Sequence, residues 1–75
     1  MPPEFPAFTP QKIIKILEKS GFQLDRQKGS HCIYLHPESR KRAVVPLHKK
    51  DLSKGTAWGI LRQAGIEKSD LLELL

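Results

Sequence analysis

The sequence is poor in cysteine, in long hydrophobic runs and in acidic residues. Its single cysteine, Cys32, excludes an intramolecular disulfide and favours a reducing compartment. No apolar run approaches the roughly 18 residues needed to span a bilayer. Residues 1–6 have neither the basic nor the apolar region of a signal peptide. We therefore expect a cytoplasmic domain that makes no membrane contact.

The length limits what the fold can enclose. A chain of 75 residues suffices for one domain. A domain of this size buries only about 60% of the surface of its unfolded chain. A deep cavity for a large cofactor is therefore not expected, and we predict a function that needs none.

Acidic residues are scarcest where basic residues gather. The chain has 13 Lys and Arg against 8 Asp and Glu, for a net charge of +5. Residues 26–56 carry a net charge of +6, whereas residues 1–25 are neutral and residues 57–75 carry −1. A phosphate backbone is the obvious counter-charge for such a segment. A basic surface kept for solubility is the alternative.

Spacing and end signals predict two helices. A first helix is expected over residues 10–20, because Thr9 is a good N-cap and Gly21 supplies a left-handed stop. A second helix is expected to begin near Ser53 or Thr56 and to end before residue 65.

Runs of strand-forming residues predict three strands between the helices, at residues 22–27, 31–36 and 42–45. Their short connections make them antiparallel neighbours. The first strand alternates apolar and polar residues and is expected to be half-buried. In the second strand His31, Ile33 and Leu35 share a face, which we take to be the core face.

These elements divide the chain into three parts. Residues 1–8 form a Pro-rich extension, residues 9–66 the domain, and residues 67–75 a short helical tail that packs on the core or docks on a partner. The fold class is α+β, with the order α-β-β-β-α, both helices on one face of a three-stranded antiparallel sheet, and a short C-terminal helix. It resembles the double-stranded-RNA-binding domain, in which a basic cluster at the start of the last helix grips phosphates.

The histidines are candidates for metal binding or for catalysis. Strand geometry argues against a metal site, because His31 and His36 point to opposite faces of a strand. Cys32 and His36 share a face but lie about 13 Å apart along it, whereas zinc needs ligands at about 2.0–2.3 Å. We therefore expect no metal site.

His31 is the candidate for proton transfer. It follows Gly29-Ser30 at the mouth of a strand, flanked by Arg26 and Lys28. A half-buried imidazole among cations favours the neutral form, which accepts a proton. RNA carries its own nucleophile, the 2′-OH, so one histidine with lysines could cleave it. A purely structural role for His31, capping the turn, is the alternative.

Six short motifs occur in order between residues 9 and 66. They are Lys28-Gly29-Ser30-His31, His36-Pro37, Val45-Pro46-Leu47-His48, Lys50-Asp51-Leu52, Lys54-Gly55-Thr56 and Ile60-Leu61-Arg62-Gln63-Ala64-Gly65. This set resembles the HicA family, small toxins of bacterial and archaeal toxin–antitoxin pairs that are described as mRNA interferases.

The resemblance implies a metal-independent endoribonuclease with His31 as its general base, neutralised by a HicB-type antitoxin that covers the active face. RNA would be the substrate, contacted by Lys28, Gly29, Ser30, His48, Lys49, Lys50 and Lys54. Two alternatives stay open. One is a non-catalytic RNA-binding module that uses the same basic face. The other is a protein-interaction module built on Trp58 and the leucines of the tail.

Overall fold

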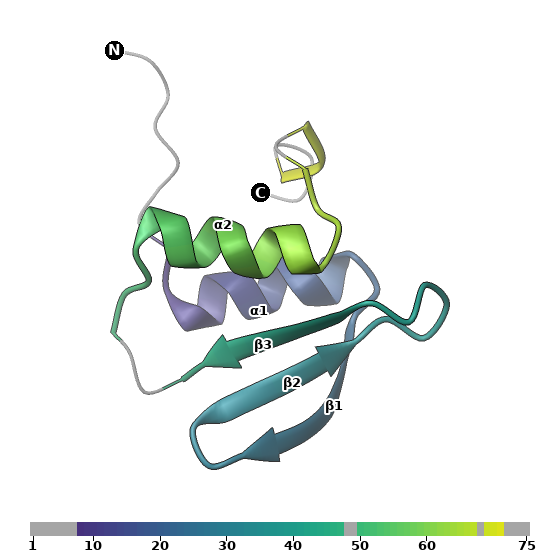
Figure 1. Cartoon of the computed structure of the whole chain (residues 1–75), viewed down its shortest axis with the longest axis horizontal. Helices are drawn as coiled ribbons and strands as arrows, with labels where there is room; N and C mark the ends of the chain where they lie inside the picture. The colour runs from purple at the N-terminus through teal and green to yellow at the C-terminus, as the bar shows by residue number, and fades with distance from the viewer. Residues whose placement is uncertain (1–7, 48–49, 68, 72–75) are drawn as a thin grey trace.

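The computed structural model describes residues 8–47, 50–67 and 69–71. Its elements, shown in Figure 1, are α1 (Pro10–Lys19), β1 (Gln23–Lys28), β2 (His31–Leu35), β3 (Arg42–Pro46) and α2 (Lys54–Gln63). Residues 69–71 are also helical. The expected α-β-β-β-α order is confirmed, and no helix among the described residues is long and apolar enough to cross a membrane.

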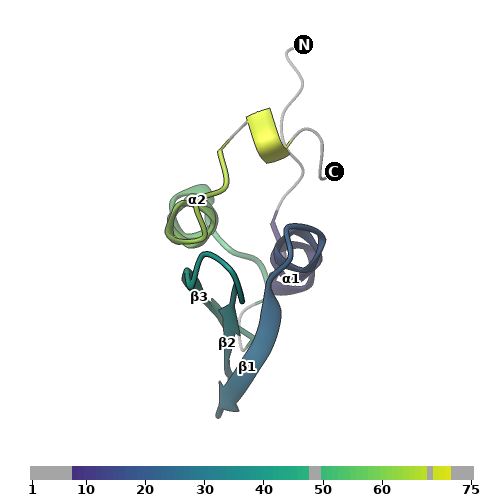
Figure 2. The same ribbon diagram turned by 90° about the vertical axis from the view of Figure 1, so that its right-hand side faces the viewer.

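The three strands form one antiparallel sheet in the order β1-β2-β3. Both helices lie on the same face of this sheet (Figures 1 and 2), as the sequence predicts. The opposite face is covered by no described element. We call it the open face of the sheet.

Each helix ends in the same backbone motif. Gly21 follows α1 with φ +97°, and the N–H of Phe22 donates to the carbonyl of Leu17 at 2.9 Å. Gly65, with φ +76°, and Ile66 repeat this arrangement after α2. Glycine adopts the left-handed conformation without steric penalty, and the motif satisfies carbonyls that the helix end leaves unpaired.

The core lies between the helices and the covered face of the sheet. Ile13 and Leu17 of α1 and Leu61 of α2 are fully buried within it. Phe8 is 2% exposed, and its carbonyl accepts the Leu52 N–H at 2.7 Å, which joins the start of α1 to the segment before α2. Leu71 is also fully buried, so the C-terminal helical turn packs on the core at this residue.

The face that β2 turns toward the core differs from the expected one. Cys32 and Tyr34 are buried at 4% and 5% exposure, whereas His31 is exposed and Ile33 and Leu35 are half-buried. The expectation that the last three form the core face is wrong. Both faces of β2 carry apolar residues, so the alternation of the sequence alone does not show which face is buried. The helices decide, because they pack on the face that carries Cys32 and Tyr34.

The expectation of a half-buried first strand is also wrong. Every residue of β1 is exposed, and Leu24 is 53% exposed although it lies opposite the buried Tyr34. The helices pack mainly against β3, at the other edge of the sheet. The residues of β1 that face the helix side are therefore less covered by the helices than those of β3.

Candidate active site

The β1–β2 turn places Lys28 and His31 opposite each other. Gly29 and Ser30 form a two-residue turn, in which Gly29 has φ +57° and Ser30 does not have a positive φ. This is the pattern of a type II′ hairpin turn, which takes glycine at its first position. The Gln27 side chain supports the turn by donating from Nε2 to the Gly29 carbonyl at 3.0 Å. The register then pairs Lys28 with His31.

The end of β3 closes the other side of this turn. Pro46 lies opposite His31 in the β2–β3 ladder. The Leu47 N–H donates to the Ser30 carbonyl at 2.6 Å. His31 therefore stands in the middle of a row of three residues, with Lys28 on one side and Pro46 on the other.

His31 lies on the open face of the sheet and is exposed. The half-buried position expected for it is wrong, because the helices cover the opposite side of β2. Exposure suits His31 for proton transfer, because an imidazole in contact with solvent can take a proton from a bound ligand and pass it to water.

The remaining predicted contacts come from the segment between β3 and α2. Lys50 and Lys54 are exposed, and Lys54 is the first residue of α2. Ser53 is the N-cap of that helix, and its hydroxyl accepts the Thr56 N–H at 3.2 Å. The segment leaves β3 at the same end of the sheet as His31 (Figure 1). His48 and Lys49 lie outside the described residues.

His36 belongs to a different part of the molecule. It follows the far end of β2, and its ring packs edge-on against Phe22 with centroids 5.2 Å apart. Its Nδ1 accepts the N–H groups of Glu38 and Ser39, each at 3.2 Å. These contacts give His36 a structural role in the loop between β2 and β3.

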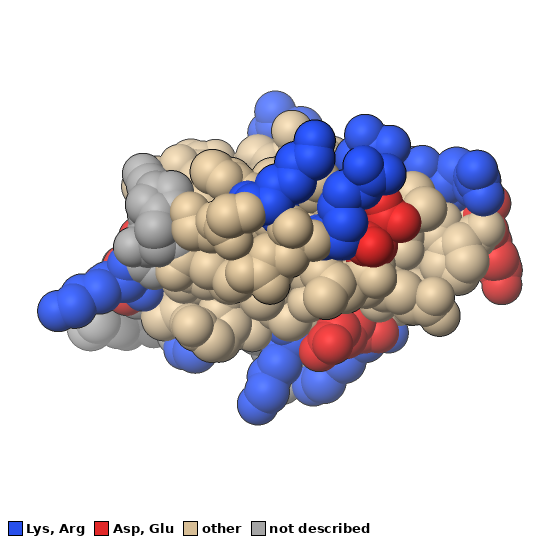
Figure 3. All heavy atoms as spheres, turned by 90° about the horizontal axis from the view of Figure 1, so that it is seen from below, with Lys and Arg blue, Asp and Glu red and all other residues tan. Residues whose placement is uncertain are grey.

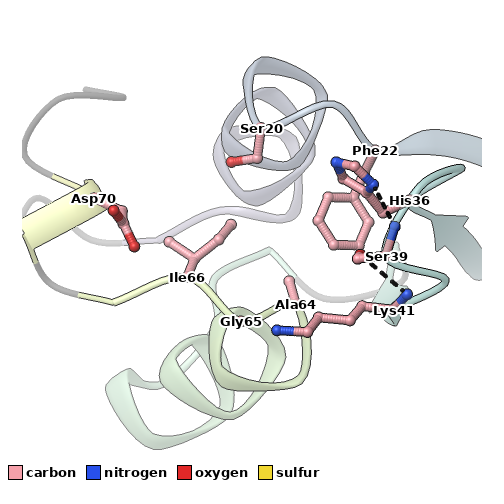
Figure 4. A pocket seen from close by; sticks show the side chains of 9 residues that line it. All are labelled: Ser20, Phe22, His36, Ser39, Lys41, Ala64, Gly65, Ile66 and Asp70. Carbon is pink, nitrogen blue, oxygen red and sulfur yellow. Dashed lines mark hydrogen bonds between the residues drawn. The ribbon is translucent and has the colours of Figure 1, made fainter.

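A pocket of about 310 Å³ opens beside His36, between the ends of α1 and α2 (Figure 4). Lys41 reaches across it, and its side chain lies against Gly65. Asp70 lies on the opposite side, where its carboxylate accepts the Glu67 N–H at 3.0 Å. The pocket is separated from His31 by the length of β2, about 13 Å, so the two are distinct places.

Side chains that could share a metal ion do not gather in the described parts of the chain. Within residues 8–47, 50–67 and 69–71, no three His, Cys, Asp or Glu side chains are placed to hold one ion. Cys32 faces the core while its neighbour His31 faces away.

The core side of the sheet carries one perturbed group. Burial raises the pKa of the Tyr34 phenol above its usual value of 10.0, and the negative charges of Glu18 and Cys32 raise it further. The phenol therefore stays neutral behind the site.

Sequence reasoning named Arg26 only as a residue flanking His31 and did not connect Arg42 with it, although both cations share a face with His31. Arg26 lies opposite Ile33, and Arg42 lies opposite Leu35, so both belong to the open face. Because the sequence analysis assigned His31, Ile33 and Leu35 to the core face of β2, it did not place charged residues beside them. The strand register would have found them, since opposite residues of a ladder point to the same side.

The comparisons with known proteins bear on this site. The chain matches the family model described as HicA toxin of bacterial toxin-antitoxin over residues 10–66, which include both helices, the sheet and the Lys28–His31 turn. The comparison with curated proteins found no match. Membership of a toxin–antitoxin family also implies a partner, the antitoxin. The matched region spans most of the 75 residues, and the chain therefore belongs to the HicA toxin family.

Proposed function

We propose that this toxin is a metal-independent endoribonuclease that cleaves mRNA, with His31 as its general base. The observation that carries the proposal is an exposed imidazole directly opposite an ammonium group, His31 opposite Lys28, in a chain of the HicA family. The charge supports it, because the segment that holds both residues carries a net +6 and suits a phosphate backbone.

The proposed reaction uses the nucleophile that RNA carries. His31 takes the proton of a ribose 2′-OH, and the 2′-oxygen attacks the adjacent phosphorus. The bond from phosphorus to the 5′-oxygen of the next nucleotide breaks, and that oxygen takes a proton from water. The protonated His31 then gives its proton to the hydroxide that is left, which restores the base. The first products are a 2′,3′-cyclic phosphate and a 5′-hydroxyl end. The reaction consumes no other reagent.

The neighbouring groups have separate roles in this proposal. The Lys28 ammonium stabilises the negative charge that grows on the phosphoryl oxygens. Gly29 and Ser30 hold the turn, while Lys50 and Lys54 bind phosphates further along the strand. His48 and Lys49 are proposed as phosphate contacts from the sequence alone.

The same surface is proposed to receive the antitoxin. A HicB-type protein that covers the open face would hide His31 and Lys28 together and would exclude RNA. Neutralisation then requires only coverage of the site, without a change in the toxin fold.

The test is cleavage of a long single-stranded RNA by the purified chain in EDTA. His31→Ala should abolish cleavage, whereas His36→Asn should retain it. The asparagine Oδ1 can replace His36 Nδ1 as the acceptor for the N–H groups of Glu38 and Ser39, which makes it a matched control at the other end of β2. Cleavage by His31→Ala at the wild-type rate would contradict the proposal. Salt-sensitive binding without any product would favour the non-catalytic RNA-binding module.

A further inference from the structure

The open face of the sheet is a regular array of nine side chains. Strand register places them in three rows of three: Gln23, Leu35 and Arg42; then Arg26, Ile33 and Val44; then Lys28, His31 and Pro46. His31 is therefore the middle residue of the end row of a larger surface, which continues for about 13 Å along β2.

The array separates charge from apolar area. Its cations stand on the outer strands, with Arg26 and Lys28 on β1 and Arg42 on β3. The middle strand contributes Ile33 and Leu35, both half-buried and uncharged. None of the nine positions is Asp or Glu; Asp25, which forms an ion pair with Arg26 at 3.3 Å, lies at the bulge in β1. Figure 3, which views the molecule from the sheet side, shows a largely uncharged band with Lys and Arg on both sides of it and some Asp and Glu beside them.

We propose that the substrate is bound as a single strand across this open face, with Arg26 and Arg42 holding phosphates that flank the one at His31. This inference rests on the proposed function, since it takes RNA to be the substrate and His31 to be the base. It adds two binding residues and the conformation of the RNA.

The apolar middle of the face favours a single strand over a duplex. In a duplex the bases are paired and stacked inside, and its surface offers ribose and phosphate. A single strand can turn its unstacked bases onto a surface while its phosphates contact cations beside it. Ile33 and Leu35 match the first kind of contact, and the cations of β1 and β3 match the second.

A second basic surface lies on α1, on the opposite side of the sheet from His31. Lys12, Lys15 and Lys19 are exposed on α1, which packs on the covered face of the sheet. RNA held along α1 would lie on the opposite side of the sheet from His31. RNA could therefore bind along the open face or along α1, and substitutions on the two surfaces can distinguish these paths.

Two adjacent cations provide a matched pair for the experiment. Arg42 belongs to the open face, whereas the side chain of Lys41 lies against Gly65 on the helix side. Affinity for a short fluorescein-labelled single-stranded RNA is measured by anisotropy in the His31→Ala background, so that the RNA stays whole. Cleavage by each single variant is measured in parallel, with His31 intact.

Arg42→Gln and Arg26→Gln should each weaken binding by about five- to tenfold and reduce the slope of log affinity against log salt by about 0.7. Lys41→Gln and Lys15→Gln should stay within about twofold of the parent. Ile33→Thr should weaken binding with an unchanged salt slope, because it removes apolar contact and no charge. The matching RNA duplex should bind more weakly and without dependence on Arg42.

The outcomes separate this inference from the proposed function. Cleavage by the parent chain with no loss in the Arg26 and Arg42 variants would overturn the open-face path and leave the nuclease intact. A loss confined to Lys15→Gln would place the RNA on α1 and would also overturn it. Absence of RNA binding and of cleavage in every form would overturn both. Equal losses in Lys41→Gln and Arg42→Gln would indicate non-specific charge attraction and would overturn the inference alone.

Discussion

Lys28 lies directly opposite His31 in the β1–β2 ladder, joined to it by a turn of only two residues. Residues directly opposite in an antiparallel pair have Cβ atoms about 4.5–5.5 Å apart. The backbone register thus places the Lys28 and His31 side chains next to each other on the open face, where the ammonium can reach a group bound at the imidazole. A phosphate placed against His31 meets Lys28 as well.

This relationship predicts a charge-dependent role for Lys28 in the proposed cleavage. Lys28→Gln should lower the cleavage rate by about tenfold or more, because one electrostatic donor to the reacting phosphate is lost. Lys28→Arg should recover most of the rate, since the charge remains. Single-turnover rates at saturating RNA make the comparison independent of binding. Equal rates for Lys28→Gln and the parent would remove Lys28 from the reaction.

The turn between these residues predicts a backbone effect on stability. Gly29 has φ +57°, and a Cβ added there would meet nothing within 4 Å. Gly29→Ala should therefore destabilise the fold by about 1–2 kcal/mol through its left-handed conformation alone. Gly59→Ala is the matched control, since its Cβ also meets nothing but it lies within α2. There alanine should stabilise by about 0.5–1 kcal/mol, and urea unfolding measures both changes.

The C-terminal turn should contribute to folding through a single leucine. Leu71 is fully buried, so Leu71→Ala should lower the free energy of unfolding by about 2–4 kcal/mol. Leu24→Ala is the control with the same side-chain change at a site that is 53% exposed, and it should have little effect. Equal losses in denaturant unfolding would show that Leu71 does not pack on the core in solution.

Tyr34 predicts a loss of stability at alkaline pH. Its pKa is raised in the fold, first by burial and then by Glu18 and Cys32, from an unfolded value of 10.0. Above that value the native state binds more protons than the unfolded state, so the free energy of unfolding falls as pH rises. Below the unfolded pKa both states keep the phenol protonated, and Tyr34 makes no contribution to the pH dependence of the free energy of unfolding.

Tyr34→Phe should remove this part of the alkaline loss. Denaturation at about pH 8 and about pH 11 should show a smaller difference for the variant than for the parent. Tyr34 is the single tyrosine of the chain, so tyrosinate absorbance reports its titration directly. A tyrosine that titrates in the native protein at its unfolded value would contradict the prediction.

The order of elements could be predicted because local signals determine it. Thr9 and Gly21 set the ends of α1, and Gly29-Ser30 sets the first hairpin. Ser53 caps α2 as one of the two expected residues. Each of these signals acts within a few residues, where the chemistry of one side chain or one φ angle is sufficient.

Which face is buried could not be predicted from the same information. Cys32 and Tyr34 compete with Ile33 and Leu35 for the core, and by apolar content the second pair is the stronger candidate. The position of the helices determines which face is buried, because they cover Cys32 and Tyr34 together with Ala43. The same long-range packing leaves His31 exposed and places Arg26 and Arg42 on the open face beside it.

The sheet joins only strands that are neighbours in the sequence, β1 with β2 and β2 with β3. Pairings of this kind close short loops, and hairpins form in about 1–10 μs. Contact between α1 and α2, and the Phe8–Leu52 bridge, must instead bring distant segments together, which is the slower event. A newly made chain is therefore expected to align Lys28 with His31 early, and to gain a rigid scaffold behind them only when its two helices meet.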